Sequence, residues 1–403
     1  MQPPPPPRPA RPAQPAQPSR PSRLGDIAGF SIDRVAQAAE ADAEVLRLEN
    51  LDTDIPPPPA ALEATRAAVG QDDANSYLPF LGSAELRAAA AAHVSRLSGV
   101  HYDPDTQTIV TAGGTEGLFN ALLALIEPGD EVVVTDPTYA GMLQRVRLAG
   151  GVPRFVPFVV RDGGWALALD RFHDAVTDRT RVIFLMNPSI PSGAVLTRED
   201  WDEIARVCTE RGIWLLYNAA MERILFDRRR YIHPAALGGL SDLTITVGSV
   251  SKEYRMIGWR VGWVTGPPRV MNRIGLVSIY NVVTPVGIAQ PGALAALVDP
   301  AGGGVTDAVA EWERRRDTVL AELNGLPVVR ADGGWSLLVD TGALGHDGAD
   351  ASARLLEHGK VAATPMTHWG HENAARFVRI VFSNEPVERL RGLGERFRRA
   401  LRL

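Results

Sequence analysis

Residues 249–263 read "SVSKEYRMIGWRVGW", and they include one of only two lysines in the chain. The sequence has 42 residues of the Lys and Arg types, and all except Lys252 and Lys360 are arginines. Arginine can replace lysine at solvated positions, but it cannot lose its proton near neutral pH and form an imine. A lysine at position 252, in a chain that otherwise uses arginine, therefore indicates chemistry that requires an amine.

The residues around Lys252 are typical of a phosphate site. The apolar run "LTITVGS" (243–249) predicts a strand that ends at Ser249, so Lys252 would follow the carboxyl end of a strand, where open α/β sheets bind ligands. Ser249 and Ser251 offer hydroxyl groups, and Arg260 offers a planar guanidinium suited to a phosphate. A nearby arginine in a partly dry cleft would also lower the pKa of Lys252. The alternative is a solvated lysine on a turn.

Short β-rich runs alternate with amphipathic helical patterns from about residue 105 onward. Continuous apolar strands separated by helices predict an α/β fold with a mostly parallel sheet covered on both faces. The last part of the chain predicts a smaller α/β unit, closed by one helix over residues 385–401. We expect a disordered Pro/Arg-rich tail, an N-terminal segment of the small domain, a large domain and a C-terminal small domain, at residues 1–25, 26–60, 61–300 and 301–403.

The composition argues against several classes of partner. A net charge of −5 over 403 residues indicates neither a nucleic-acid nor a membrane-surface partner. The longest apolar runs, such as residues 122–126, are too short to span a bilayer. Cys208 is the only cysteine, which fits a reducing compartment and predicts a cytoplasmic protein. The spacing "HWGH" (368–371) lacks further ligands nearby, so we expect no metal; His368 is a candidate for the substrate mouth.

"SVSKEYRMIGWRVGW" resembles the lysine motif of class I/II aminotransferases, which are fold-type I enzymes dependent on pyridoxal phosphate (PLP). Further segments are similar to this family in the same order from about residue 50 to the C-terminus. These segments are "NSYLPFLGSAELRAA" (75–89), "TAGGTEGLFNALLAL" (111–125), "PGDEVVVTDPTYAG" (128–141), "NPSIPSG" (187–193) and "RFVRIVF" (376–382). The resemblance implies a large PLP-binding domain, a small domain built from both chain ends, and a homodimer with its active site at the interface.

The resemblance also implies a role for each matching residue. Lys252 would hold PLP as an imine and act as the general acid/base at Cα. Phosphate and pyridine contacts would come from Gly114, Thr115, Tyr139, Ser249, Ser251 and Arg260, with Tyr77 reaching across from the neighbouring subunit. The free N–H groups and dipole of a helix beginning near Gly114 suit an anion. Arg379 would hold the substrate α-carboxylate, and Asn187 is a second candidate for binding substrate.

The contacts that tune the cofactor ring depart from the family pattern. In "WLLYNAAMERILFD" (214–227), Asn218 stands where the family has the Asp that pairs with the pyridine nitrogen, and Met221 stands in place of a Tyr. Ile190 replaces an Asn of the loop at 187–193. A neutral amide holds less proton on the ring nitrogen, so we expect slower transamination than is usual. Tyr217 and Arg223 are candidates for replacement contacts.

The sequence is compatible with three hypotheses for the function of the protein. The first is a PLP enzyme of specialised metabolism that acts on an α-amino acid through an external aldimine and a Cα carbanion, in elimination, decarboxylation, oxidation or C–C bond formation. The alternative is an ordinary amino-acid aminotransferase with a 2-oxo acid acceptor. The third is a regulator or a non-catalytic binder with an aminotransferase-like domain; we expect neither, because such a regulator needs a DNA-reading module for which the short proline tail has no room, and because Lys252 and Arg379 are both present. The substituted ring contacts favour the first hypothesis.

Overall fold

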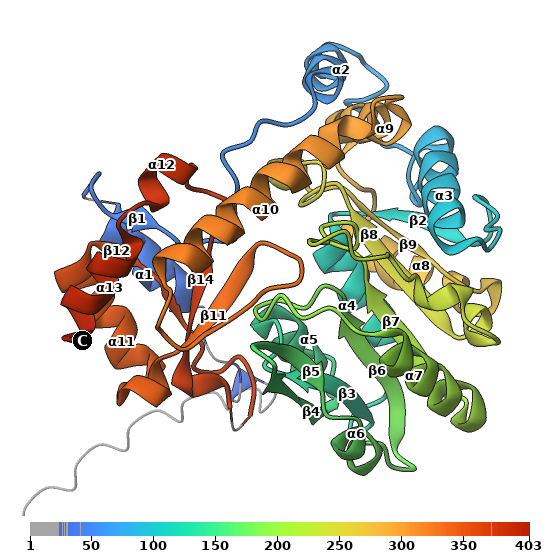
Figure 1. The fold of residues 1–403 in the computed structure, drawn as a ribbon. Helices are drawn as coiled ribbons and strands as arrows, with labels where there is room; N and C mark the ends of the chain where they lie inside the picture. The colour runs from blue at the N-terminus through green and yellow to red at the C-terminus, as the bar shows by residue number, and fades with distance from the viewer. Residues whose placement is uncertain (1–23, 26, 28, 30, 41, 372) are drawn as a thin grey trace, which may run out of the picture.

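The computed structural model describes residues 24–403 except 26, 28, 30, 41 and 372. The tail predicted at residues 1–25 lies outside the described residues apart from Leu24 and Gly25. The described chain forms a large sheet flanked by helices and a smaller sheet beside it (Figure 1).

The large sheet has eight strands and is mostly parallel, as the sequence predicts. Neighbouring strands from β8 to β4 pair in parallel, and the pairs at both edges are antiparallel. In spatial order the strands are β2 (Thr108–Thr111), β9 (Gly262–Thr265), β8 (Thr244–Ser249), β7 (Trp214–Asn218), β6 (Thr180–Met186), β3 (Glu131–Asp136), β4 (Val152–Arg161) and β5 (Gly164–Leu167). Most central positions are apolar and buried, because helices cover both faces.

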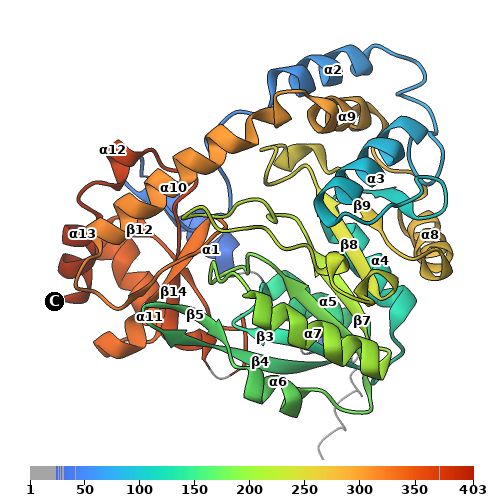
Figure 2. The same cartoon turned by 45° about the vertical axis from the view of Figure 1, so that its right-hand side comes forward.

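Helices lie on both sides of this sheet, with α7 on one face and α4 on the other (Figures 1 and 2). The long helix α10 runs from the large sheet toward the small one. The helices of this region are α2 (Pro59–Val69), α3 (Ala84–Ser98), α4 (Gly114–Leu125), α5 (Ala140–Leu148), α6 (Leu169–Ala175), α7 (Arg198–Arg211), α8 (Pro268–Val282), α9 (Gln290–Val298) and α10 (Val305–Glu322). Within the described chain, no single helix is long and apolar enough to cross a membrane. Helix α8 and residues 287–298, which are bent by 118° relative to each other, reach the required length and apolar composition only when they are taken together.

The smaller sheet joins segments from both ends of the chain. An antiparallel sheet runs in the order β10 (Val328–Val329), β11 (Ser336–Asp340), β14 (Phe377–Val381) and β13 (Thr364–Pro365). Beside it, β1 (Leu46–Arg47) pairs in parallel with β12 (Val361–Ala362). This pairing brings the N-terminal segment, including α1 (Ser31–Ala39), next to the C-terminal part of the chain; the domain boundaries themselves stay a prediction.

The C-terminal helix differs from the prediction. Residues 385–401 were expected to form one helix, but the structure has α12 (Val387–Leu390) and α13 (Leu393–Leu401), with α11 (Gly348–Arg354) preceding them. Gly392, between the two helices, adopts a φ of 81°. Glycine reaches this left-handed conformation without the steric cost that a side chain would bring, so the helix ends and restarts there.

Candidate active site

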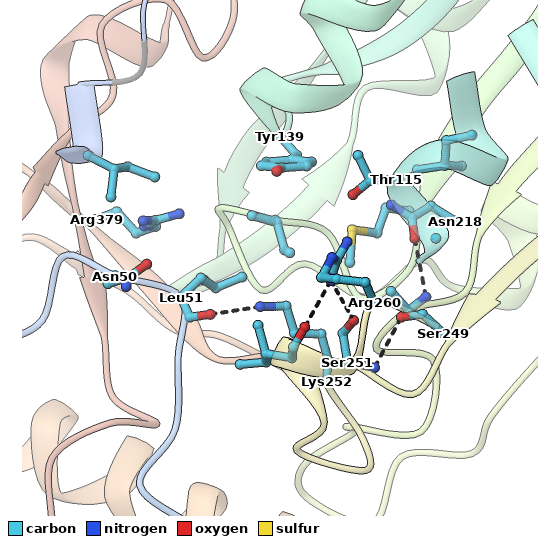
Figure 3. A pocket seen from close by; sticks show the side chains of 17 residues that line it. Asn50, Leu51, Thr115, Tyr139, Asn218, Ser249, Ser251, Lys252, Arg260 and Arg379 are labelled. Atoms are coloured by element: carbon cyan, nitrogen blue, oxygen red, sulfur yellow. Dashed lines mark hydrogen bonds between the residues drawn. The ribbon is translucent and has the colours of Figure 1, made fainter. Parts of the chain in front are cut away.

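A cavity of about 420 Å³ lies at the carboxyl ends of the central strands (Figure 3). It collects residues from β7, β8, the start of α4, the N-terminal segment and β14, which are distant in sequence. Its walls are Ile32, Asn50, Leu51, Gly114, Thr115, Leu118, Tyr139, Met186, Ile190, Asn218, Ala220, Ser249, Ser251, Lys252, Ile257, Arg260 and Arg379. Nine of the eleven residues predicted for the site are among them.

Lys252 lies three residues beyond β8, and its side chain enters the middle of the cavity (Figure 3). Its Nζ donates a hydrogen bond to the carbonyl oxygen of Leu51 at 2.7 Å and lies 4.8 Å from the ring centroid of Trp335. Burial lowers the pKa of Lys252 to about 7; Arg379 and Arg260 add to the decrease and Asp52 opposes it. Much of the amine is therefore unprotonated near neutral pH and can act as a nucleophile or a base.

Arg260 and the start of α4 form a corner of the cavity suited to an anion. Nη1 of Arg260 donates to the Ser251 hydroxyl at 3.3 Å and to the Ile257 carbonyl at 3.0 Å. A Cβ atom at Gly113 would lie 2.4 Å from Nη2 of Arg260, so only glycine allows this close approach. Since α4 begins at Gly114, its first N–H groups lack partners within the helix and favour a negative group.

Arg379 forms the opposite end of the cavity (Figure 3). Nη2 donates to the Glu49 carbonyl at 2.6 Å and to Oγ1 of Thr364 at 3.3 Å, and the guanidinium lies 4.7 Å from the ring centroid of Trp369. Nε of Arg379 is buried without a hydrogen-bond partner. Burial lowers the pKa of Arg379 to about 10, but the group remains charged near neutral pH. A buried cation that lines a cavity and keeps a free donor is suited to a carboxylate.

Tyr139 and Asn218 flank the space between these two ends. Tyr139 precedes α5 and its ring centroid lies 5.9 Å from that of Trp369. Asn218 ends β7, where its Oδ1 accepts from the Ala220 N–H at 3.2 Å and its Nδ2 lies 3.7 Å from the sulfur of Met142. The amide of Asn218 therefore has weak partners and can turn a donor or an acceptor to a ligand.

Two predicted site residues are not brought to this cavity. Tyr77 is 81% exposed and lies outside the cavity within this subunit. Asn187 is buried, and its Oδ1 accepts from the Leu196 N–H at 2.8 Å, so in this structure its side chain supports its own loop.

The candidate replacement contacts were wrong. The Tyr217 hydroxyl donates to the Asn187 carbonyl at 3.2 Å, and Arg223 forms an ion pair with Glu253 at 2.6 Å; neither lines the cavity. Met221 is fully buried away from the cavity.

Several groups at or near the cavity carried no signal in the sequence. Ile32 comes from a stretch of the N-terminal segment that matches no motif, and Leu51 contacts Lys252 through a backbone carbonyl, which has no residue-type signal. His368 does not line the cavity, whereas its neighbour Trp369 packs on Arg379. Over the described residues, no group of three or more His, Cys, Asp or Glu side chains is placed to hold a metal ion.

Comparison with known proteins identifies the family. The sequence profile described as "Aminotransferase class I and II" matches residues 45–397. The chain belongs to the class I and II aminotransferases. Among relatives of this family, aspartate/prephenate aminotransferase of Thermus thermophilus is 33% identical over 90% of this chain and 95% of its own length. The probable N-succinyldiaminopimelate aminotransferase DapC of Mycobacterium tuberculosis is 34% identical over 77% of this chain and 78% of its own length.

A solved aminotransferase confirms the fold. The structure of N-succinyldiaminopimelate aminotransferase from Mycobacterium tuberculosis superimposes with a TM-score of 0.88 at 31% identity, and covers 95% of this chain and 99% of that one. The protein is therefore a fold-type I, PLP-dependent aminotransferase-family enzyme.

The cavity fits the cofactor of this family. The corner formed by Arg260, Ser251 and the start of α4 offers charge and N–H donors for the PLP phosphate. Lys252 supplies an amine that is partly unprotonated near neutral pH, and Tyr139 supplies an aromatic ring. Gly113 leaves the space that the arginine requires.

Proposed function

We propose that the protein transfers the amino group of an α-amino acid to a 2-oxo acid. The observation that carries this proposal is the placement of Lys252 between Arg379 and Arg260 in one cavity (Figure 3). A carboxylate and a phosphate can bind at the two ends while a reactive amine stands between them. The relatives reported above are named as aminotransferases, which supports amino transfer ahead of the non-standard reactions.

Each residue has a defined task in this proposal. PLP, when bound, supplies the electron sink for chemistry at the substrate Cα. Arg379 holds the α-carboxylate and orients the Cα–H bond, and Lys252 takes and returns the proton at Cα. Arg260, Ser249, Ser251, Gly114 and Thr115 line the cavity and would hold the phosphate, while Tyr139 and Asn218 would contact the cofactor ring.

Replacement of Lys252 tests these assignments. Lys252→Ala is expected to abolish turnover with every amino acid, because no other described lysine lines the cavity and Arg379 stays protonated. Lys252→Arg is the matched variant that keeps the charge and loses the reactive amine, and it should be equally inactive. Substantial remaining activity in either variant, with PLP still bound, would contradict the proposal.

The ring contacts favour a second candidate function. Asn218 and Ile190 both line the cavity, and neither side chain carries a charge. The cofactor ring would therefore have a neutral contact at each of these two positions. Elimination, decarboxylation, oxidation or C–C bond formation on an amino acid remains the second hypothesis. The discriminating readout is the cofactor released after one round of reaction, which is pyridoxamine phosphate only after amino transfer.

We also propose a homodimer. The large exposed apolar side chains Tyr77, Phe80, Tyr280, Val283 and Val286 belong to two segments that are joined by a hydrogen bond from Oγ1 of Thr284 to the Leu78 carbonyl. Exposed apolar residues gathered in this way suit a self-complementary contact between two copies. This surface would bring Tyr77 to the partner's cavity. The cytoplasmic location expected from the composition stays a prediction.

The names of the relatives suggest a first substrate panel. They point to aspartate, prephenate and N-succinyldiaminopimelate as compounds to test. Aspartate carries a second carboxylate, which the enzyme would have to bind or tolerate.

A further inference from the structure

All three cations that line the cavity already have a task under the proposed function. Arg379 binds the α-carboxylate, Arg260 binds the phosphate, and Lys252 is the reactive amine. Within the part of the chain that the structure describes, no other Lys, Arg or His side chain lines this space. A substrate with a carboxylate in its side chain would therefore bury that charge without a partner.

The walls that remain for the side chain are neutral. On the side of the N-terminal segment they are Ile32, Asn50 and Leu51, and on the side of the lysine turn there is Ile257. Asn50 is the only polar side chain in this set. Ile32, Leu51 and Ile257 are only partly buried and pack on the main core, so they offer apolar surface to a ligand. Contact with an apolar substrate would remove this surface from water.

Two acidic residues, Glu49 and Asp52, adjoin the wall residues Asn50 and Leu51 in the sequence. Asp52 acts on Lys252 in the direction that raises its pKa, which places a negative charge within range of the cavity. Glu49 is buried next to Arg379, and one of its carboxylate oxygens lacks a hydrogen-bond partner. Neither carboxylate lines the cavity, and Glu49 also pairs with Arg47 at 2.7 Å, but both would repel a second substrate carboxylate rather than bind it.

The surface that a second copy would contribute does not supply the missing cation. The sequence has no Lys, Arg or His from residue 67 to residue 86, around Tyr77. It has none from residue 274 to residue 313, around Tyr280. Both segments carry the exposed apolar side chains of the proposed dimer contact. A subunit that approached through this surface would present apolar and acidic residues.

We propose that the side-chain subsite selects α-amino acids with an uncharged, apolar side chain and rejects those with a second carboxylate. This inference rests on the proposed function for the roles of Arg379 and Lys252. It differs from the aspartate, prephenate and N-succinyldiaminopimelate in the names of the two relatives reported above.

Binding of unreactive carboxylates tests the subsite without turnover. Purified PLP-loaded enzyme would be titrated with 4-methylpentanoate, succinate and 6-aminohexanoate, and dissociation constants would be measured by calorimetry near neutral pH. These probes share one carboxylate for Arg379 and differ in the group at the far end. We expect 4-methylpentanoate to bind about 10- to 100-fold more tightly than either charged probe, because burial of an unpaired charge is costly. Equal or tighter binding of succinate or 6-aminohexanoate would overturn the proposal.

A charge placed in the subsite should reverse this preference. Ile32→Arg adds a cation at the wall, and Ile32→Gln is the matched polar variant without charge. We expect Ile32→Arg to tighten succinate by about tenfold relative to Ile32→Gln, and to weaken 4-methylpentanoate, since an opposite charge then pairs with the second carboxylate. If the two variants bind succinate equally well, Ile32 does not face the second carboxylate, and the assignment of the subsite is wrong.

A parallel half-reaction separates failure of this inference from failure of the proposed function. Leucine and aspartate would each be mixed with the holoenzyme, and conversion of the cofactor would be followed by absorbance. Faster conversion by aspartate overturns the apolar subsite and leaves amino transfer intact. Apolar probes that bind tightly, with no conversion by either amino acid, support the subsite and contradict amino transfer.

Discussion

Asn218→Asp should accelerate amino transfer. The substitution is nearly isosteric and changes a neutral amide at the end of β7 into a carboxylate. The native Asn218 is only 6% exposed, so the new charge would be buried. A carboxylate there would hold a proton on the ring nitrogen of the cofactor, which strengthens the electron sink. At a separation of about 3 Å, two unit charges attract by about 5 kcal/mol at an effective dielectric constant of about 20.

Desolvation reduces that attraction. Asn218 has only the Ala220 N–H and the sulfur of Met142 as partners, so the new carboxylate would have no cation before the cofactor binds. We therefore expect the apoprotein to lose about 1–3 kcal/mol of stability. The net gain left for the ring nitrogen is about 2–4 kcal/mol, which is about 30-fold to 10³-fold in the rate of a step limited by proton removal at Cα.

Rapid-mixing absorbance of the holoenzyme with one amino acid measures this rate without an acceptor. Asn218→Ala is the control, because it removes the amide and adds no charge, and it should be as slow as or slower than the native enzyme. Urea unfolding of the apoprotein measures the stability cost independently. If Asn218→Asp binds PLP normally and its rate does not rise, the neutral contact does not limit the reaction and the reasoning fails.

Other predictions concern the lysine, its turn and the dimer. In the apoprotein, the amine of Lys252 should become reactive toward PLP as pH rises through about 7, because its pKa is lowered and the charged form predominates only below that value; a rate that first rises near pH 10 would contradict this. Glu253→Gln should cost about 1–3 kcal/mol in urea unfolding, because it removes the charge that pairs with the partly buried guanidinium of Arg223, whereas Glu210→Gln at an exposed ion pair should cost less than about 1 kcal/mol. Tyr280→Asp should shift the protein from dimer to monomer in analytical ultracentrifugation, and a dimer unchanged by this charge would place the interface elsewhere.

The sequence was sufficient to predict the groups whose chemistry depends on residue type. Lys252, Arg260 and Arg379 are the residue types that an imine, a phosphate and a carboxylate require, and two of them follow or belong to recognisable strands. Parallel strands bring their carboxyl ends to one edge, so the convergence of distant motifs could be expected as well.

The partners of these groups could not be predicted in the same way. Lys252 is held by the backbone carbonyl of Leu51, which lies 201 residues earlier in the sequence, and a carbonyl has no residue-type signal. Trp335 lies just before β11 and Trp369 follows β13, and the packing of their rings on Lys252 and Arg379 depends on the tertiary fold. Asn187 matched a motif by letter, but its side-chain oxygen is used by its own loop.

Mass spectrometry of the cofactor after one round of reaction tests the central claim most directly. The holoenzyme would be mixed with leucine, phenylalanine or aspartate, with no 2-oxo acid present, and the cofactor would be released and weighed together with the product. The account predicts pyridoxamine phosphate and the 2-oxo acid of an apolar amino acid. Recovery of PLP while the amino acid is consumed would contradict amino transfer and show that Asn218 and Ile190 accompany a different reaction.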